Sequence, residues 1–280
     1  MTTERPRETF VAFDCQGDLC LGVVTHTQAA CEAGVVIVVG GPQYRAGSHR
    51  QFTVLARELS AHGIPVLRFD YRGMGDSEGA MRTFETIDAD IGAAVTALVR
   101  ETGVTRVVLW GLCDGASAAL MYAQRDPRVA GVVGVNPWVR TEASLATAHL
   151  RHYYVRRLVA PDFWRKTIRG ALDVGRVMRG VTASLRAARS EAVVPFLTRM
   201  EEGWRALRAP ALFILSGRDL TAREFEAWAA QDPARRARLA SPSCSVCAVA
   251  DADHTFTSDA ARAAMTRATI EWVARLCPAS

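Results

Sequence analysis

The chain has 280 residues and a formal net charge of +5, with 49% hydrophobic and 22% charged residues. This composition is typical of a soluble globular protein that is long enough to bury a sizeable core in one large domain. No apolar run approaches the roughly 18 residues that a membrane-spanning helix needs. The N-terminal residues also lack the hydrophobic segment of a secretory signal. We therefore expect a cytoplasmic protein without a membrane span.

Seven cysteines are scattered along the chain, at positions 15, 20, 31, 113, 244, 247 and 277. Their odd number and irregular spacing indicate reduced thiols rather than a disulfide framework. Cys244 and Cys247 form a C-x-x-C pair, but no second pair and no nearby histidine completes a zinc site. The pair also falls in a predicted strand, where side chains three positions apart point to opposite faces. We therefore predict no metal site and no cofactor.

Apolar runs typical of strands recur along the chain, at residues 8–14, 19–25, 35–39, 64–69, 107–110, 129–135, 211–215 and 244–249. Segments in which apolar residues have helical spacing lie between or after many of these strands, at residues 50–62, 83–101, 221–231 and 258–276. The first two strands are expected to form an antiparallel hairpin at a sheet edge. The later alternation of strand and helix predicts an α/β fold, with a mostly parallel eight-stranded sheet and helices on both faces.

The fourth predicted strand leads into the run Asp70-Tyr71-Arg72-Gly73-Met74-Gly75-Asp76-Ser77-Glu78-Gly79. We interpret this run as a structural, glycine-rich turn that is fixed by an Asp–Arg pair. It lacks the G-x-G-x-x-G spacing of a dinucleotide-binding loop. The turn therefore gives no indication of a nucleotide cofactor.

A strand, a sharp turn and a helix of small residues meet around Gly111-Leu112-Cys113-Asp114-Gly115. The pattern matches the Gly-x-Ser-x-Gly nucleophile elbow, with cysteine in place of serine. The two glycines leave room for the strand and the helix to cross. Cys113 would lie at the helix N-terminus, where the helix dipole stabilises a thiolate. The alternative is a buried structural cysteine, and the flanking strand and helix favour the catalytic interpretation.

The alternation of strands and helices lapses over residues 138–204. We predict that this segment is a helical cap, inserted into a core domain formed by residues 1–137 and 205–280. Residues 140–208 contain 13 arginines and one lysine against six acidic residues, a net charge of +8, which leaves −3 for the rest of the chain. The candidate substrate-binding residues of the cap are His149, His152, Arg156, Arg157 and Trp164.

Three residues of suitable chemistry each follow a predicted strand, in the order nucleophile, acid, base: Cys113, Asp219 and His254. A cysteine nucleophile needs a base, and the base needs a carboxylate that orients it. Taken singly, Asp219 resembles a helix N-cap and His254 a loop histidine, but their joint placement predicts a Cys-His-Asp triad. The alternatives are Asp251, Asp253 or Glu224 as the acid, and pocket-lining roles for His149 and His152.

Backbone N–H groups must then stabilise the oxyanion that forms on the substrate. The candidates are the N–H of Asp114 and those of Gly41 and Gln43, which follow the third predicted strand. Pro42 has no N–H and is excluded. The carboxylate of Asp114 should oppose formation of the neighbouring thiolate unless it is paired.

Five runs together resemble one bacterial family: GGPQYRAGSHRQF, VLRFDYRGMGDSEG, LWGLCDGASAALMYA, SGRDLTAREF and DADHTF. They look like those of the exosortase-A-system-associated hydrolases of type 1, which are encoded beside exopolysaccharide genes. The resemblance covers both halves of the core domain and is weakest in the cap. It implies an α/β-hydrolase fold and a hydrolase activity. Gly115 departs from the family pattern, in which alanine is expected.

These residues indicate an enzyme that attacks an ester or thioester carbonyl through an acyl-cysteine intermediate. Water as the acceptor gives a hydrolase, whereas a thiol, amine or hydroxyl acceptor gives an acyl- or aminoacyltransferase. The basic cap is expected to suit an acidic acyl carrier protein or coenzyme A. A catalytically silent binding protein is the alternative from another class. No nucleic acid is expected, because the arginines lie in an insertion and not on a recognised reader motif.

Overall fold

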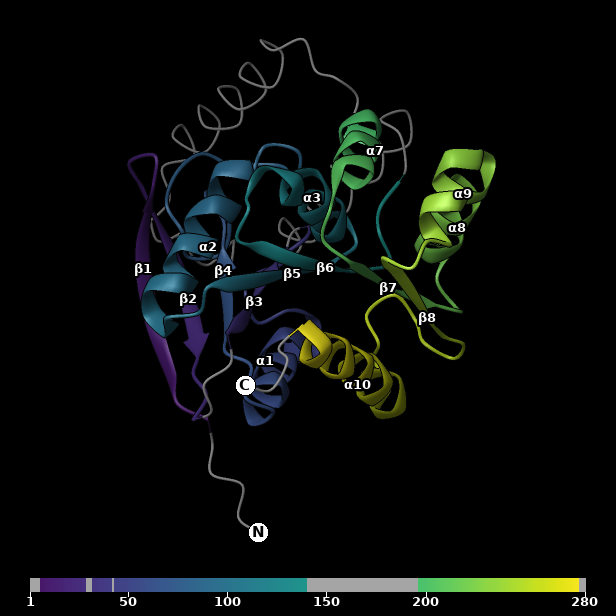
Figure 1. Cartoon of the computed structure of the whole chain (residues 1–280). Helices are drawn as coiled ribbons and strands as arrows, with labels where there is room; N and C mark the ends of the chain where they lie inside the picture. Colours follow the sequence, from purple (N-terminus) through teal and green to yellow (C-terminus); the bar gives the residue numbers. More distant parts are fainter. Residues whose placement is uncertain (1–5, 29–31, 42, 140–195, 277–280) are drawn as a thin grey trace, which may run out of the picture. The chain divides into compact units, whose positions relative to one another are not determined.

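The computed structural model describes residues 6–28, 32–41, 43–139 and 196–276. Their strands form one sheet in the order β1-β2-β4-β3-β5-β6-β7-β8 (Figure 1). The strands are β1 (Glu8–Cys15), β2 (Asp18–Thr25), β3 (Ala33–Val38), β4 (Val66–Asp70), β5 (Arg106–Leu112), β6 (Val129–Val135), β7 (Ala211–Ser216) and β8 (Cys244–Val249). The β1–β2 hairpin is antiparallel, β2 is also antiparallel to β4, and all later neighbours are parallel.

The described helices are α1 (Gln51–Ala61), α2 (Asp88–Thr102), α3 (Asp114–Tyr122), α7 (Phe196–Ala206), α8 (Leu220–Gln231), α9 (Pro233–Leu239) and α10 (Asp259–Leu276). Two 3₁₀ turns accompany them, at Ser48–Arg50 and Ala123–Arg125. Figure 1 shows α1 and α10 below the sheet and α2, α3 and α7 above it. The sheet is thus covered on both faces, and the predicted α/β architecture with its eight-stranded, mostly parallel sheet is confirmed.

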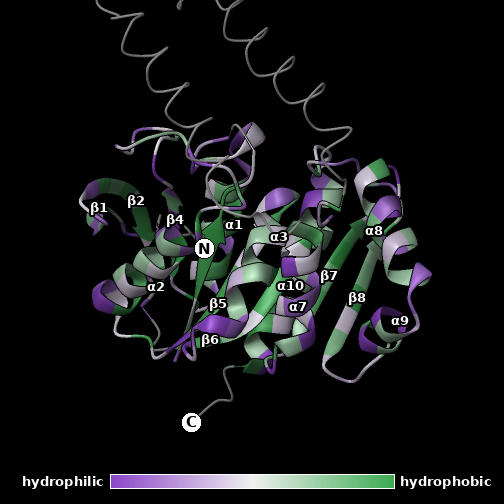
Figure 2. Ribbon diagram, turned by 90° about the horizontal axis from the view of Figure 1, so that it is seen from above, coloured by the Kyte–Doolittle hydropathy of each residue, from purple (hydrophilic) through white to green (hydrophobic). Residues whose placement is uncertain are grey.

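The central strands are apolar on both faces because helices cover both. Every residue of β3 is buried, and so is every residue of β7. Phe52 of α1 and Met265 of α10 belong to the core cluster beneath the sheet, together with Trp110 of β5. In Figure 2, β7 is coloured as hydrophobic, whereas α9 at the margin carries hydrophilic residues. This core holds the carboxyl ends of the parallel strands, and therefore the loops that follow them, in fixed positions.

The glycine-rich turn after β4 is fixed by Asp–Arg pairs, as expected, and the partners of Asp70 and Arg72 lie outside the turn. Asp70 pairs with Arg45, which also contacts Asp76 at 2.8 Å. Arg72 instead forms two hydrogen bonds with Asp90 of α2, at 2.9 and 3.0 Å. Asp90 lies in the first turn of α2, which begins at residue 88 and not at 83. The two carboxylates thus tie the turn to two different neighbouring segments.

Two further differences concern the second half of the chain. Helix α9 was not predicted, although Asp232 caps it and proline follows as its first residue. The compact unit that contains the sheet ends at Val139 and resumes at Thr198, so the last residues of the expected cap belong to it. Trp204 of α7 explains this, because it is buried with its ring 5.4 Å from that of Phe213 in β7. None of the described helices is both long and apolar enough to cross a membrane.

Candidate active site

Cys113 occupies the sharp turn between β5 and α3 in a strained backbone conformation, with φ 59° and ψ −124°. A non-glycine residue in such a region costs about 1–3 kcal/mol and persists only where its surroundings fix it. Here the N–H of Cys113 donates to the carbonyl oxygen of Val135 at 2.9 Å. Its carbonyl oxygen accepts from the N–H groups of Ala116 and Trp138, at 3.0 and 3.3 Å. The turn therefore presents a half-buried thiol at the N-terminus of α3.

The flanking glycines are required by close backbone approach. A Cβ on Gly111 would collide with the backbone of Gly115, and one on Gly115 would collide with the carbonyl oxygen of Val38. The Gly115 Cβ would also lie 3.0 Å from the nitrogen of Gly40. The departure from alanine noted at this position thus has a physical reason, because β3 and its following loop leave no space for a methyl group.

Asp219 and His254 lie in contact, with Oδ2 of the carboxylate 2.8 Å from Nδ1 of the ring. Asp219 caps α8 and accepts from the N–H groups of Thr221 and Ala222. Burial pushes the pKa of Asp219 up, but the hydrogen bond and charge of His254 and these N–H groups hold that pKa below its ordinary value. An ionised Asp219 fixes the proton of His254 on Nδ1 and leaves Nε2 as the basic nitrogen. The His254 side chain is 35% exposed, so Nε2 can be reached.

Two of the three alternative acids, Asp251 and Asp253, have other partners. Asp253 accepts the backbone N–H of Thr257 at 3.0 Å. Asp251 is exposed and pairs with Arg218 at 2.8 Å. Glu224 lies further along α8 than Asp219. The structure therefore brings Asp219 to the ring of His254, whereas Asp251 and Asp253 are held by other partners.

Asn136 links the loops of the site, and the sequence analysis missed it. Its side-chain nitrogen donates to Ser216 Oγ at 2.8 Å and to the carbonyl oxygen of His254 at 3.3 Å, and its oxygen accepts the N–H of Ser216 at 2.9 Å. Asn136 is fully buried and has a φ of 45°. Because Val135 and Trp138 on either side contact the Cys113 backbone, this segment connects the elbow to the His254 loop. The signal in the sequence was an Asn-Pro pair directly after a strand.

The carboxylate of Asp114 points to the loop after β3. Its Oδ2 accepts the N–H of Gly41 at 2.9 Å, and its Oδ1 accepts the N–H of Gly115 at 3.1 Å. Asp114 is only 6% exposed. The N–H of Gly41, expected to face an oxyanion, is therefore engaged by this carboxylate. The backbone N–H of Asp114 lies in the first turn of α3, next to Cys113.

The loop that contains Gln43 is held by a second carboxylate. Asp70 accepts the backbone N–H of Arg45 at 2.7 Å and also pairs with its guanidinium group. Gln43 lies between this anchor and Gly41, and its buried Oε1 has no hydrogen-bond partner among the described residues. The five cap candidates, His149, His152, Arg156, Arg157 and Trp164, lie outside the described residues.

One group of metal-ligand type occurs in the part of the chain that the structure describes, formed by Cys15, Cys20 and Asp90. Burial and the charge of Asp90 raise the pKa of Cys20 to about 12 and also raise the pKa of Cys15. In the absence of a metal, both thiols are therefore protonated at neutral pH. The carboxylate of Asp90 is moreover occupied by Arg72. The guanidinium of Arg72 thus already supplies the positive charge that balances Asp90.

Comparisons with known proteins agree with this architecture. The chain matches the polyketide transferase grgF of a Penicillium species at 38% identity over 95 residues, which are 30% of this chain and 31% of that protein. It matches the thiohydrolase apmlB of Arthrinium phaeospermum at 39% identity over 88 residues, 30% of this chain and 29% of that protein. These matches span less than a third of each relative.

Two solved structures share the fold over nearly the whole chain. An esterase of Pyrococcus furiosus superposes with a TM-score of 0.66 at 16% identity, covering 97% of this chain and 94% of that one. The crystal structure of GrgF from Penicillium superposes with a TM-score of 0.64 at 16% identity, covering 97% and 99%. At such identities the likeness shows the fold alone. The model of the alpha/beta hydrolase family matches residues 35–268, so the chain belongs to the alpha/beta hydrolase family.

Proposed function

We propose that this protein is an enzyme with a cysteine nucleophile that cleaves an ester or a thioester and passes the acyl group to water. The observation that carries the proposal is the strained Cys113 at the strand–helix turn. Hydrogen bonds through the segment around Asn136 link this turn to the loop of His254, whose ring is oriented by the Asp219 carboxylate. Strain at a turn that exposes a thiol is characteristic of a nucleophile and has no advantage for a structural cysteine. The finer resemblance to exosortase-associated hydrolases stays a prediction.

The first half-reaction acylates the enzyme. His254 Nε2 takes the proton of the Cys113 thiol as the sulfur forms a bond to the carbonyl carbon. The electron pair of the carbonyl moves to its oxygen, which we place near the backbone N–H of Asp114. When the carbonyl re-forms, the C–O or C–S bond to the leaving group breaks. His254 gives its proton to the departing alcohol or thiol, and an acyl-cysteine remains.

The second half-reaction repeats these steps with water. His254 removes a proton from water as its oxygen bonds to the acyl carbon, the C–S bond to Cys113 breaks, and the proton returns to the sulfur. The products are a carboxylic acid and the free enzyme. A sulfur nucleophile gains little against an amide, whose amine is a poor leaving group, so esters and thioesters are the expected substrates.

Intact-protein mass spectrometry with p-nitrophenyl acetate and with acetyl-coenzyme A tests the proposal. We expect one acetyl group on Cys113 in the wild type and none there in Cys113→Ala. Cys247→Ala is the matched control, because Cys247 is also half-buried but lies on β8, and it should acylate as the wild type does. A wild-type protein that never acylates would instead indicate a silent binding protein on a hydrolase scaffold.

Acyl transfer to an acceptor other than water is the second candidate. Two observations favour it: the partial match to a protein named a polyketide transferase, and the +8 charge of residues 140–208. Such a charge suits the phosphates of coenzyme A or an acidic acyl carrier protein. Acylation by these anionic donors should then slow with added salt, because the Debye length falls from about 10 Å at 0.1 M to about 3 Å at 1 M.

The control donor is a small neutral ester, and the rate at which it acylates the protein should hardly change with added salt. Charge reversal at Arg156 and Arg157 should slow acylation by the anionic donor alone. Equal effects on both donors would remove the carrier hypothesis and leave hydrolysis of small esters as the function.

A further inference from the structure

The sheet ends at β8, and this strand carries none of the charged residues or prolines that often protect an edge. Its sequence, Cys-Ser-Val-Cys-Ala-Val, contains no charge and no proline. An edge strand offers unpaired backbone N–H and C=O groups, and natural proteins guard them with charged residues, prolines or bulges. The opposite edge, β1, carries both Glu8 and Asp14. In β8 the central Val246 is 49% exposed.

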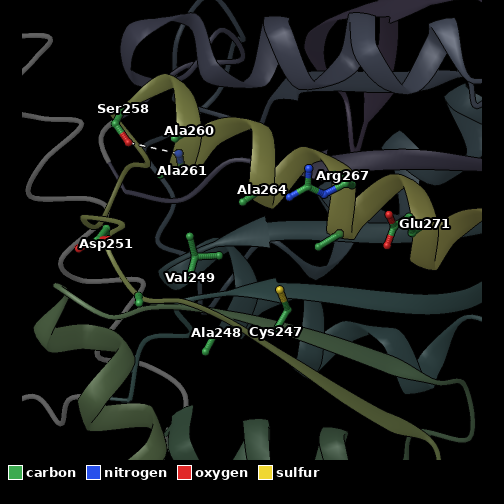
Figure 3. A pocket seen from close by; sticks show the side chains of 12 residues that line it. Cys247, Ala248, Val249, Asp251, Ser258, Ala260, Ala261, Ala264, Arg267 and Glu271 are labelled. Carbon is green, nitrogen blue, oxygen red and sulfur yellow. Dashed lines mark hydrogen bonds between the residues drawn. The ribbon is translucent and has the colours of Figure 1, made fainter.

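A cavity of about 460 Å³ lies beside this edge, between β8 and α10. Figure 3 shows Cys247 and Val249 pointing from β8 toward the helix. Small residues form the helix side, namely Ala260, Ala261, Ala264 and Ala268. The groove is thus open along the edge of the sheet, and its walls are largely apolar.

Two opposite charges, Arg267 and Glu271, stand on α10 along the same groove (Figure 3). They are four residues apart on an exposed helix surface, yet neither forms an ion pair with any described residue. When a second copy is rotated by 180°, its negative charge faces the positive charge of the first copy and its positive charge faces the negative one. This pattern suits a second copy of the same chain better than it suits an anionic or a cationic partner.

We propose that the protein forms a dimer in which β8 pairs antiparallel with β8 of a second copy. Antiparallel pairing within one sheet requires a twofold axis perpendicular to the sheet. Such an axis keeps both α10 helices on the same face and brings the two grooves together beneath the shared strands. Arg267 of each copy then faces Glu271 of the other. The dimer extends the sheet across both chains and covers the Val246 of each copy.

Sedimentation velocity over a range of protein concentrations tests the dimer. We expect the wild type to dimerise and Val246→Lys to raise the dimer Kd by at least about tenfold, because lysine on an edge strand opposes pairing. The matched control is Phe10→Lys, which introduces the same charge at an 82% exposed residue of the other edge strand and should leave the Kd unchanged. Circular dichroism checks that each variant folds.

Charge reversal provides an independent arm that leaves the strand intact. Arg267→Glu and Glu271→Arg should each weaken the dimer, and the double variant should restore it, because the pair is only exchanged. A wild type that stays monomeric at its highest soluble concentration would overturn the proposal. So would a Val246→Lys dimer as tight as the wild type, or dissociation caused by Phe10→Lys, which would place the interface on β1.

Discussion

The carboxylate of Asp114 accepts the N–H of Gly41 at 2.9 Å and thereby joins the Cys113 turn to the loop after β3. The Asp114 side chain thus links two segments that are 73 residues apart in the sequence. Its negative charge is offset by two backbone N–H donors, those of Gly41 and Gly115. Because the carboxylate is paired in this way, it opposes ionisation of the neighbouring Cys113 thiol less than an unpaired carboxylate would.

Asp114→Asn should destabilise the fold by about 1–3 kcal/mol. The amide keeps one acceptor oxygen for the two backbone N–H groups, and its NH₂ group would lie against the N–H group that loses its acceptor. Urea denaturation measures this change. The matched control is Asp232→Asn, since Asp232 also accepts two backbone N–H groups but does so at the exposed start of α9. There asparagine caps as well as aspartate, and the change should be small. Equal effects at the two positions would contradict the linking role of Asp114.

Asp219 should make the stability of the protein depend on pH in the acid range. Its pKa is lowered in the folded state, so the unfolded chain binds the proton more tightly. The resulting stabilisation is fully present above the unfolded pKa of about 3.9 and is lost as the pH falls through the folded pKa. Asp219→Asn removes this contribution. The difference in the free energy of unfolding between wild type and variant should therefore shrink as the solution is acidified.

The same variant should also lower kcat/KM by orders of magnitude, about 10⁴-fold where a triad carboxylate orients the histidine. Asp251→Asn is the control, because Asp251 lies in the His254 loop but is exposed and pairs with Arg218. It should change neither activity nor acid stability appreciably. Full activity in Asp219→Asn would remove this carboxylate from the mechanism.

Much of the fold could be predicted because buried parallel strands appear in the sequence as short apolar runs, as in β3 and β7. The order nucleophile, acid, base also predicted which carboxylate lies against His254. Contacts between distant polar side chains could not be predicted in this way. Nothing in the sequence near Asp70 or Arg72 indicates that their partners are Arg45 and Asp90. Such partners depend on how loops converge in three dimensions, which the local sequence pattern does not record.

Asn136 should be a positioning residue whose loss lowers both stability and activity. Replacement by alanine removes its hydrogen bonds to Ser216 and to the carbonyl of His254, and it places a Cβ-bearing residue without a polar side chain at φ 45°. We expect a loss of about 1–3 kcal/mol for the unsatisfied buried groups. The glycine variant separates the two causes, because glycine adopts this backbone conformation freely. Asn136→Gly should therefore be more stable than Asn136→Ala.

Activity distinguishes positioning from mere packing at Asn136. If the residue fixes the His254 loop, kcat should fall in both variants at a temperature where both are fully folded, while KM changes little. The rate at which iodoacetamide alkylates Cys113 should fall as well, since that rate depends on the base near the thiol. Variants that lose stability but keep wild-type kcat and alkylation rates would restrict Asn136 to a structural role.

Gly115→Ala is the sharpest test of how tightly the elbow fits against β3. A methyl group at this position meets the carbonyl oxygen of Val38 and the nitrogen of Gly40, which are backbone atoms and cannot rotate away. Overpacking of this kind costs about 1–3 kcal/mol, and it would push α3 and Cys113 away from the loop that contains Gly41. We therefore expect both the midpoint of thermal unfolding and kcat to fall.

Gly103→Ala is the control, because Gly103 ends α2 at φ 74° with open space around it. It should lose about 1 kcal/mol through its backbone conformation alone and keep its activity. The resemblance to relatives with alanine in this position makes the outcome informative, since a fully active and stable Gly115→Ala would mean that β3 and α3 can separate enough to admit a methyl group.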